Sequence, residues 1–190
     1  MSELASESST QRPAKRRPSV SEGVRRSTWS TLDTPFGPFT AVVDETGAVL
    51  ASGWTAALDD LVPLIHSDLR PASVERGGIG AAGEAITAYH GGELSAIDDI
   101  PVRQRSGAFL EHAWDILRAV PAGAPVTYTE YAAKAGRPAA VRAAASACAR
   151  NAAALFVPCH RVLRLDGSLG GFRWGLRVKQ GLLAHESAAR

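Results

Sequence analysis

Residues 127–162, TYTEYAAKAGRPAAVRAAASACARNAAALFVPCHRV, decide the fold. This stretch begins with Thr127 and carries Glu130 three positions later. The two residues form a capping-box pattern, in which each side chain hydrogen-bonds a backbone amide that the first helical turn leaves unpaired. We therefore expect a short helix that runs to Ala135.

A second helix is expected in the same stretch. Gly136 breaks the first helix, and Pro138 suits the first position of a helix because the amide hydrogen that proline lacks would be unpaired there. This second helix would run to about Arg150. Two helices joined by a tight turn that contains glycine predict a helix-turn-helix, a motif that binds DNA.

The expected second helix consists mostly of Ala, Ser and Cys, so its backbone can approach another surface closely. Val141, Ala145 and Cys148 share one face by their spacing and are expected to pack inward, with Cys148 as a small buried hydrophobe. Arg142 would then point outward. A helix that merely packs tightly on its neighbour, with Arg142 in solvent, explains the same pattern.

The end of the stretch carries the chemical groups. The apolar run 152–157, predicted as a short buried strand or extended segment, leads to Cys159 and His160. Adjacent side chains on an extended chain point to opposite faces, so His160 would accept the thiol proton through a bridging water. Glu186, in the region that follows, is the candidate carboxylate to orient the imidazole. Cysteine hydrolases use similar groups, so the reaction stays open at this point.

The residues before this stretch have the pattern of a small α/β domain. Two β-prone runs, 36–43 and 48–54, are joined by a hairpin turn at Asp44-Glu45-Thr46-Gly47. Short helices are expected at 58–67 and 81–90, the latter stopped by two glycines.

The chain therefore divides into three parts. Residues 1–27 are rich in Ser, Arg, Pro and Glu and are expected to form a disordered basic tail. Residues 28–97 are expected to form the α/β N-terminal domain. Residues 98–190 would form a mostly α C-terminal domain with the helix-turn-helix, beginning with an amphipathic helix over 109–120.

The net charge of +2 hides a segregation of charge along the 190 residues. Residues 28–133 hold five basic and fourteen acidic side chains, whereas residues 134–179 hold nine basic side chains against Asp166 alone. This asymmetry favours a polyanion-binding surface in the C-terminal half. Arginines that are simply solvated would give the same count.

The composition excludes several classes of protein. No apolar run reaches the roughly 18 residues that span a bilayer, and the N-terminus lacks the hydrophobic stretch of a secretory signal, so a cytoplasmic location is expected. Cys148 and Cys159 are too few for a disulfide framework and lack the four-ligand grouping of a structural zinc site. We expect both to be free thiols.

The motif Pro-Cys-His-Arg-Val at 158–162 resembles the acceptor motif of the O6-alkylguanine-DNA alkyltransferases. The resemblance covers roughly residues 32–187 and is strongest from residue 101 onward. Further residues match in the family's order and spacing: Phe109, Trp114, Pro121-Ala122-Gly123, Thr127-Tyr128, Ala135-Gly136-Arg137-Pro138, Arg142-Ala143, Asn151, the loop 166–175, Lys179 and Leu182-Leu183-Ala184-His185-Glu186.

The resemblance implies direct reversal of DNA damage, in which Cys159 irreversibly accepts an alkyl group from the O6 of guanine, once per molecule. His160 and Glu186 would form the water-linked relay that generates the thiolate, the form that attacks carbon. Tyr128 would donate a proton or a hydrogen bond to guanine N3. The substrate pocket that it implies is lined by Cys148, Val162, Leu169, Phe172, Arg173 and Trp174.

The resemblance also implies how DNA is bound. The second helix of the helix-turn-helix would enter the minor groove, and Arg142 would insert where the flipped base has left. Thr127, Arg137 and Ala143 would lie at the DNA together with Tyr128. Asn151 is similar to the hinge asparagine that ties the recognition helix to the acceptor turn.

The implied partner is double-stranded DNA that contains O6-alkylguanine, bound by a monomer without a cofactor. The zinc cluster of vertebrate members has no counterpart, so no metal is expected. The chain departs from the family pattern at Cys148-Ala149-Arg150, at Ala152 and at Phe172. The alternative is a helix-turn-helix regulator without alkyl transfer, which would bind regardless of alkylation and would not need Cys159.

Overall fold

The structure is a computed structural model and describes residues 26–189. The prediction of a disordered tail therefore lies outside the described residues, except at its end. Arg26 and Ser27 are ordered as the start of a strand, which corrects the predicted domain boundary by two residues. Within the described part of the chain, no helix combines the length and the apolar character needed to cross a membrane.

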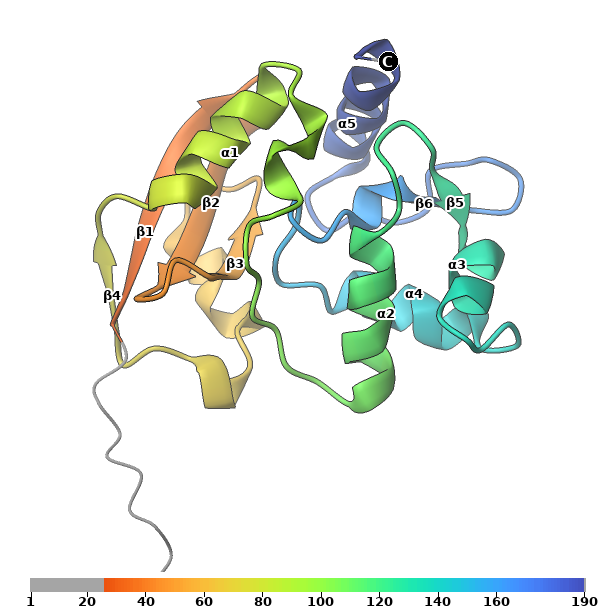
Figure 1. Cartoon of the computed structure of the whole chain (residues 1–190), viewed down its shortest axis with the longest axis horizontal. Coiled ribbons are helices and arrows are strands. Elements are labelled where there is room, and N and C mark those ends of the chain that lie inside the picture. The colour runs from red at the N-terminus through yellow and green to blue at the C-terminus, as the bar shows by residue number, and fades with distance from the viewer. Residues whose placement is uncertain (1–25, 190) are drawn as a thin grey trace, which may run out of the picture.

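A four-stranded sheet forms the N-terminal half (Figure 1). Its order is β3-β2-β1-β4, with β4 parallel to β1 and the other pairs antiparallel. The predicted hairpin is confirmed, with Gly47 at φ 83° in the turn, where glycine avoids the clash that a side chain would cause. The strands are β1 Arg26–Thr34, β2 Gly37–Asp44, β3 Val49–Gly53 and β4 Ser73–Arg76.

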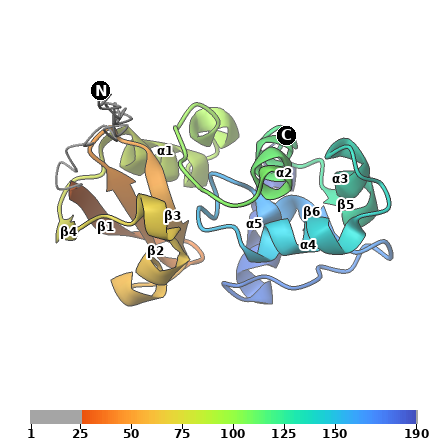
Figure 2. The same cartoon turned by 90° about the horizontal axis from the view of Figure 1, so that it is seen from below.

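Helix α1, Gly80–His90, confirms the helix predicted at 81–90 and covers one face of the sheet (Figures 1 and 2). The helix predicted at 58–67 is wrong. Three short 3-10 turns replace it, because Pro63 in the middle of the segment cannot donate the backbone hydrogen bond of a continuous helix. These turns are η1 Leu58–Asp60, η2 Val62–Leu64 and η3 Ser67–Leu69, and a fourth, η4 Leu94–Ile97, follows α1.

The C-terminal half is mostly helical, and Figures 1 and 2 both place α5 between the sheet and the α3-α4 pair. The capping box is confirmed, since the Thr127 hydroxyl accepts from the Glu130 amide and the Glu130 carboxylate accepts from the Thr127 amide. The helices are α2 Ala108–Arg118, α3 Tyr128–Lys134, α4 Val141–Ala149 and α5 Leu176–Ala188. The other elements are β5 Val126–Thr127, η5 Cys159–Arg161 and β6 Val162–Leu163, with β5 and β6 parallel.

Helix α4 begins three residues later than predicted. The amide of Ala140 donates to the carbonyl of Arg137 at 2.8 Å, which closes a turn around Pro138 before the helix starts. Proline is favoured at the second position of such a turn because its φ is already fixed. The helix-turn-helix is present, but Pro138 belongs to its turn.

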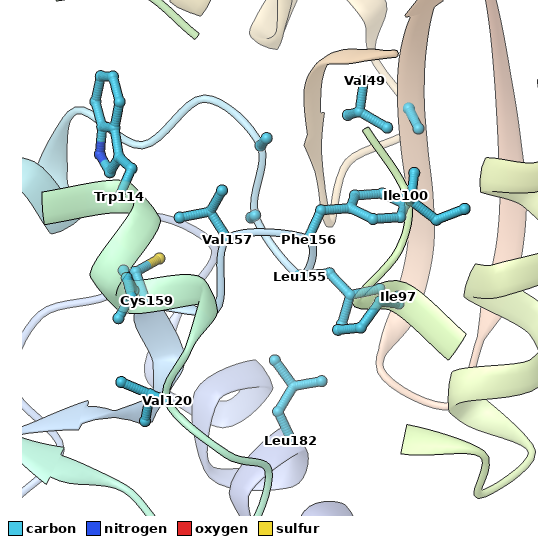
Figure 3. Close-up of a cluster of buried hydrophobic side chains, with 14 of the residues drawn as sticks. Val49, Ile97, Ile100, Trp114, Val120, Leu155, Phe156, Val157, Cys159 and Leu182 are labelled. Carbon is cyan, nitrogen blue, oxygen red and sulfur yellow. The ribbon is translucent and has the colours of Figure 1, made fainter. Parts of the chain in front are cut away.

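Residues 152–157 contact the N-terminal sheet and are buried as predicted, but they form no strand. Instead they make a short backbone bridge to Ser52 at the edge of β3, from Ser52 N to Ala152 O at 2.8 Å and from Ala154 N to Ser52 O at 3.2 Å. Leu155 then turns the chain at φ 76°, a costly conformation for a residue with a side chain. Figure 3 shows this segment crossing the core toward Cys159.

Candidate active site

Cys159 is the first residue of η5 and follows this buried segment. It is 8% exposed. The exposed part faces a cavity of about 440 Å³ between α4, the start of α3 and the loop before α5. The thiol is therefore held within the core and still reachable from one side. The cavity is lined by Tyr128, Ala145, Cys148, Ala149, Asn151, Cys159, Gly171, Phe172, Arg173 and Trp174.

Asn151 connects α4 to the acceptor turn. Its backbone amide donates to the Cys148 carbonyl at 3.4 Å, and its side-chain amide donates to the Val157 carbonyl at 2.7 Å and to Cys159 Sγ at 3.2 Å. Its side-chain oxygen accepts from Gln104 at 3.1 Å. Asn151 thus links the end of α4 to the turn that contains Cys159. Gln104, which sequence reasoning missed, holds the side-chain oxygen of Asn151 in place.

Burial raises the pKa of the Cys159 thiol, since a thiolate is costly in an apolar interior. The Asn151 donor and the charge of Lys179 oppose this shift. Lys179 is itself buried, and its ammonium donates to the Val162 carbonyl at 2.7 Å. The sequence match includes Lys179 but gave it no role. The resting thiol is therefore protonated and needs a base to become a nucleophile.

His160 supplies a base with a defined orientation. Its Nε2 lies 2.8 Å from Glu186 Oε1, and both side chains are completely buried. Nε2 carries the proton because the carboxylate can only accept, so Nδ1 is left as an acceptor. In the described part of the chain Nδ1 has no hydrogen-bond partner. The predicted pairing of His160 with Glu186 has the expected geometry.

Burial also lowers the pKa of His160, although Glu186 pulls it upward, so the imidazole is neutral at neutral pH. Burial alone would raise the pKa of Glu186, but the hydrogen bonds and charges of His160 and Arg161 outweigh it and hold that pKa well below its ordinary value. Arg161 binds Glu186 at 2.9 Å and the Val120 carbonyl at 2.6 Å. The pair is thus an ionised carboxylate beside a neutral imidazole.

Tyr128 reaches the cavity from the first turn of α3, directly after the helix-capping Thr127. Burial raises the pKa of its phenol to about 12, so the hydroxyl stays protonated and can donate a hydrogen bond into the cavity. The position fits the predicted role toward a bound base.

The inward face of α4 differs in part from the prediction. Ala144 and Ala147 are the residues buried against the core, whereas Ala145 and Cys148 line the cavity. The predicted face is confirmed in part: Val141 and Cys148 pack, partly buried, against the core, and Cys148 also lines the cavity. Because most side chains of α4 are small, the neighbouring face with Ala144 and Ala147 packs even more closely.

The outward residues of the helix-turn-helix lie as predicted. Arg142 is exposed at the start of α4 beside the half-buried Ala143. Arg137 is exposed in the turn, and its guanidinium stacks on the Phe109 ring at 4.7 Å. A cation on an aromatic face keeps most of its charge available to solvent or to a phosphate.

The loop before α5 forms one cavity wall, as predicted for Phe172, Arg173 and Trp174. Arg173 donates to the Ala149 carbonyl at 2.8 Å and so ties the loop to the end of α4. Trp174 packs against Gly53 of β3, where a Cβ would lie 2.0 Å from an indole carbon. The N-terminal sheet therefore supports the cavity wall from behind.

Two predicted pocket residues lie elsewhere. Val162 is buried in β6, where it pairs with Val126 of the parallel strand β5. Leu169 lines a neighbouring hollow instead, which shares Gly171 and Phe172 with the cavity. Residues 26–189 hold no cluster of three or more metal-ligating side chains.

Comparison with known proteins agrees with this site. The family model described as "6-O-methylguanine DNA methyltransferase, DNA binding domain" matches residues 108–188. The methylated-DNA–protein-cysteine methyltransferase of Salmonella typhimurium is 34% identical over 158 residues, which cover 82% of this chain and 92% of that protein.

Solved structures give the same result. The crystal structure of Mycobacterium tuberculosis O6-methylguanine methyltransferase matches with a TM-score of 0.71 and 27% identity, covering 86% of this chain and 94% of that one. The same organism's protein in complex with DNA matches with a TM-score of 0.70 and 26% identity, over equal shares of the two chains. The predicted fold class is confirmed, and the chain belongs to the methylated-DNA–protein-cysteine methyltransferase family of DNA-repair proteins.

Proposed function

We propose that this chain removes the alkyl group from O6-alkylguanine in duplex DNA by transferring it to Cys159, once per molecule. The observation that carries the proposal is the position of one sulfur. It faces a cavity of about 440 Å³, while the next residue in the chain, His160, is hydrogen-bonded to an ionised, buried Glu186.

The first step generates the thiolate. His160 Nδ1 accepts the thiol proton of Cys159 through a bridging water, and Glu186 stabilises the imidazolium that forms. The Asn151 amide, 3.2 Å from Sγ, stabilises the negative sulfur. The burial that raises the thiol pKa also makes the thiolate poorly solvated and therefore reactive once it forms.

The second step transfers the carbon. A sulfur lone pair attacks the alkyl carbon, an S–C bond forms, and the C–O6 bond breaks with its electron pair moving to the guanine. Tyr128 donates a hydrogen bond to guanine N3, which makes the base a better leaving group, and the proton taken from the thiol is returned to the base. The products are unmodified guanine and S-alkylcysteine. A thioether is not cleaved by any group lining the cavity, so each molecule reacts once.

The DNA contact is made by the helix-turn-helix. The M. tuberculosis relative has been solved in complex with DNA, which supports DNA binding by the matching part of this chain. In this proposal the exposed Arg142 fills the gap left by the flipped base, and Thr127, Arg137 and Ala143, none of which is fully buried, contact the DNA beside it. We further propose that the protein acts as a monomer in the cytoplasm, where a reducing environment keeps Cys159 a free thiol.

Mass spectrometry tests the proposal directly. The full chain is incubated with duplex DNA that carries one O6-methylguanine, and the peptide that contains Cys159 is analysed. The expected result is one added methyl group on that peptide, at no more than one per protein, and no methyl transfer by Cys159→Ala. DNA binding that ignores alkylation and survives Cys159→Ala, with no added mass, would instead support the regulator.

A further inference from the structure

One donor to Glu186 comes from outside the C-terminal half. The hydroxyl of Tyr89, in α1, donates to Glu186 Oε1 at 2.7 Å, and Tyr89 is completely buried. The family model for the DNA-binding domain begins at residue 108, well after this tyrosine. The N-terminal half therefore reaches into the group that orients the catalytic imidazole.

The carboxylate of Glu186 is shared among several donors. Oε1 accepts from Tyr89, from His160 Nε2 at 2.8 Å and from Arg161 at 2.9 Å. Oε2 accepts from the Gly123 amide at 3.2 Å. Because Tyr89 and His160 use the same oxygen, the hydroxyl competes with the imidazole for its electron density.

Contacts of α5 with α1 and with the turn between β1 and β2 hold Tyr89 in this place. His185, the residue before Glu186, donates from Nε2 to the Tyr89 carbonyl at 2.8 Å, so the two neighbours bind both ends of one tyrosine. Gly181, one turn earlier on α5, accommodates the Phe36 ring, which a Cβ would meet at 2.6 Å. This close packing fixes the distance between the hydroxyl and the carboxylate.

We propose that Tyr89 is a positioning residue of the acceptor site, whose hydroxyl fixes the Glu186 carboxylate and limits its pull on His160. The proposal rests on the function proposed above for its catalytic meaning. It assigns the N-terminal half a direct effect on the proton acceptor, in addition to its support of the cavity wall.

Loss of this hydroxyl has a defined electrostatic consequence. With one donor fewer, Oε1 becomes a stronger acceptor for His160 Nε2 and stabilises the imidazolium, so the pKa of His160 rises. The other charged groups around the pair stay in place: Arg161 and Lys179 oppose protonation of the imidazole, and Asp98, which follows η4, interacts with Arg161 and Glu186. Cys159 is uncharged in the resting state.

The test compares Tyr89→Phe with Tyr131→Phe in the full chain. Tyr131 is a matched control, because it is also completely buried and its hydroxyl also donates one hydrogen bond, at 2.7 Å, to the carbonyl of Ala113. The protonation of His160 is followed by ¹⁵N NMR of the imidazole across pH. We expect its midpoint to rise by about one pH unit in Tyr89→Phe, a tenfold change in proton affinity, and to stay unchanged in Tyr131→Phe.

A second substitution gives the opposite sign. Replacing Tyr89 by 3-fluorotyrosine keeps the hydroxyl but makes it a stronger donor, so the His160 midpoint should fall. Unchanged midpoints in both Tyr89 substitutions, or an equal rise in Tyr131→Phe, would overturn the proposal. Should Tyr89→Phe fail to fold, the fluorotyrosine protein decides alone.

The titration needs no alkyl transfer, so it separates this inference from the proposed function. In a transfer assay, the low-pH limb of the rate should move upward with the His160 midpoint, because only the neutral imidazole accepts the thiol proton. If wild type transfers no alkyl group while Tyr89→Phe still shifts the His160 midpoint, the proposed function is refuted and the role of Tyr89 is retained.

Discussion

The recognition helix α4 and the acceptor turn, residues 151–162, follow each other in the chain and differ in almost every physical property. Every residue of the acceptor turn is buried, whereas only Ala144 and Ala147 of α4 are. The helix uses small side chains to bring its backbone close to other surfaces. The turn is held by side-chain hydrogen bonds from Asn151, Arg161 and Lys179.

Each segment carries one cysteine and one arginine. The two cysteines differ from each other in role, and so do the two arginines. Both thiols face the same cavity, and burial raises the pKa of each, but Asn151 donates to Cys159 Sγ, while Cys148 receives no such side-chain donor from the described residues. Arg142 is exposed, whereas Arg161 is buried against Glu186. The helix therefore provides shape and contact with DNA, and the turn provides chemistry.

The two thiols give the sharpest test of this division. Cys159→Ala should abolish alkyl transfer, because it removes the sulfur that receives the Asn151 hydrogen bond and is followed in the chain by the base His160. Cys148→Ala should keep the transfer rate within about threefold of wild type, since its pKa is raised by burial and it has no base beside it. Peptide mass spectrometry after reaction with O6-methylguanine DNA measures both. Methyl groups on Cys148 would show that the helix shares the chemistry.

The two arginines test the same division through stability. Arg161→Ala should lower the free energy of unfolding by about 3–5 kcal/mol, because it leaves the buried Glu186 carboxylate without its charged partner. Arg142→Ala serves as the control and should change it by no more than about 0.5 kcal/mol, as is usual for an exposed side chain. Urea denaturation measures both values. A small effect of Arg161→Ala would mean that the turn depends little on its ion pair.

The parts of this comparison that depend on neighbouring residues were predictable from sequence. The capping box at Thr127, the hairpin turn before Gly47 and the exposed Arg142 follow from spacing and local chemistry. Glu186, 27 residues after Cys159, was a candidate partner of His160 from its residue type, and the family resemblance implied the same pair.

The parts that depend on distant contacts were not predictable. Strand β1 is mostly polar, and its extended form depends on its pairing with β2 and β4. Which face of α4 packs inward depends on which of its alanines meet α2 and α3. The roles of Gln104 and Tyr89 arise from hydrogen bonds that span 47 and 97 residues. No local pattern marks such residues.

Arg142 also gives the main functional test of the helix. Arg142→Ala should slow repair of duplex DNA on the order of 100-fold, because stabilising a flipped base is worth a few kcal/mol and each 1.36 kcal/mol is a factor of ten in rate. Reaction with a free O6-alkylated guanine base, which needs no flipping, should be unchanged. Single-turnover rates with the two substrates measure the difference. Equal slowing with both would place Arg142 in folding or in the cavity.

The smallest expected effect is the pH dependence of stability that the buried turn imposes. Burial holds the pKa of His160 below its ordinary value of 6.5, so the unfolded chain binds a proton that the folded chain does not. Stability is therefore full above about pH 6.5 and falls below it, by at most about 1.4 kcal/mol per pH unit for this group. Glu186, whose pKa is also lowered, adds a second loss below its ordinary value of 4.5.

Urea denaturation at pH 7.0 and 5.5 isolates the histidine contribution. The unfolding free energy of wild type should fall between the two values, and His160→Gln should show a clearly smaller fall, with His90, whose pKa burial also lowers, accounting for part of what remains. His112→Asn is the control for the loss of a histidine, because His112 is exposed on α2. A fall in His160→Gln equal to that of wild type would mean that folding leaves the pKa of His160 unchanged, whereas a larger fall in His160→Gln would mean that His160 is charged in the folded state and forms an ion pair with Glu186.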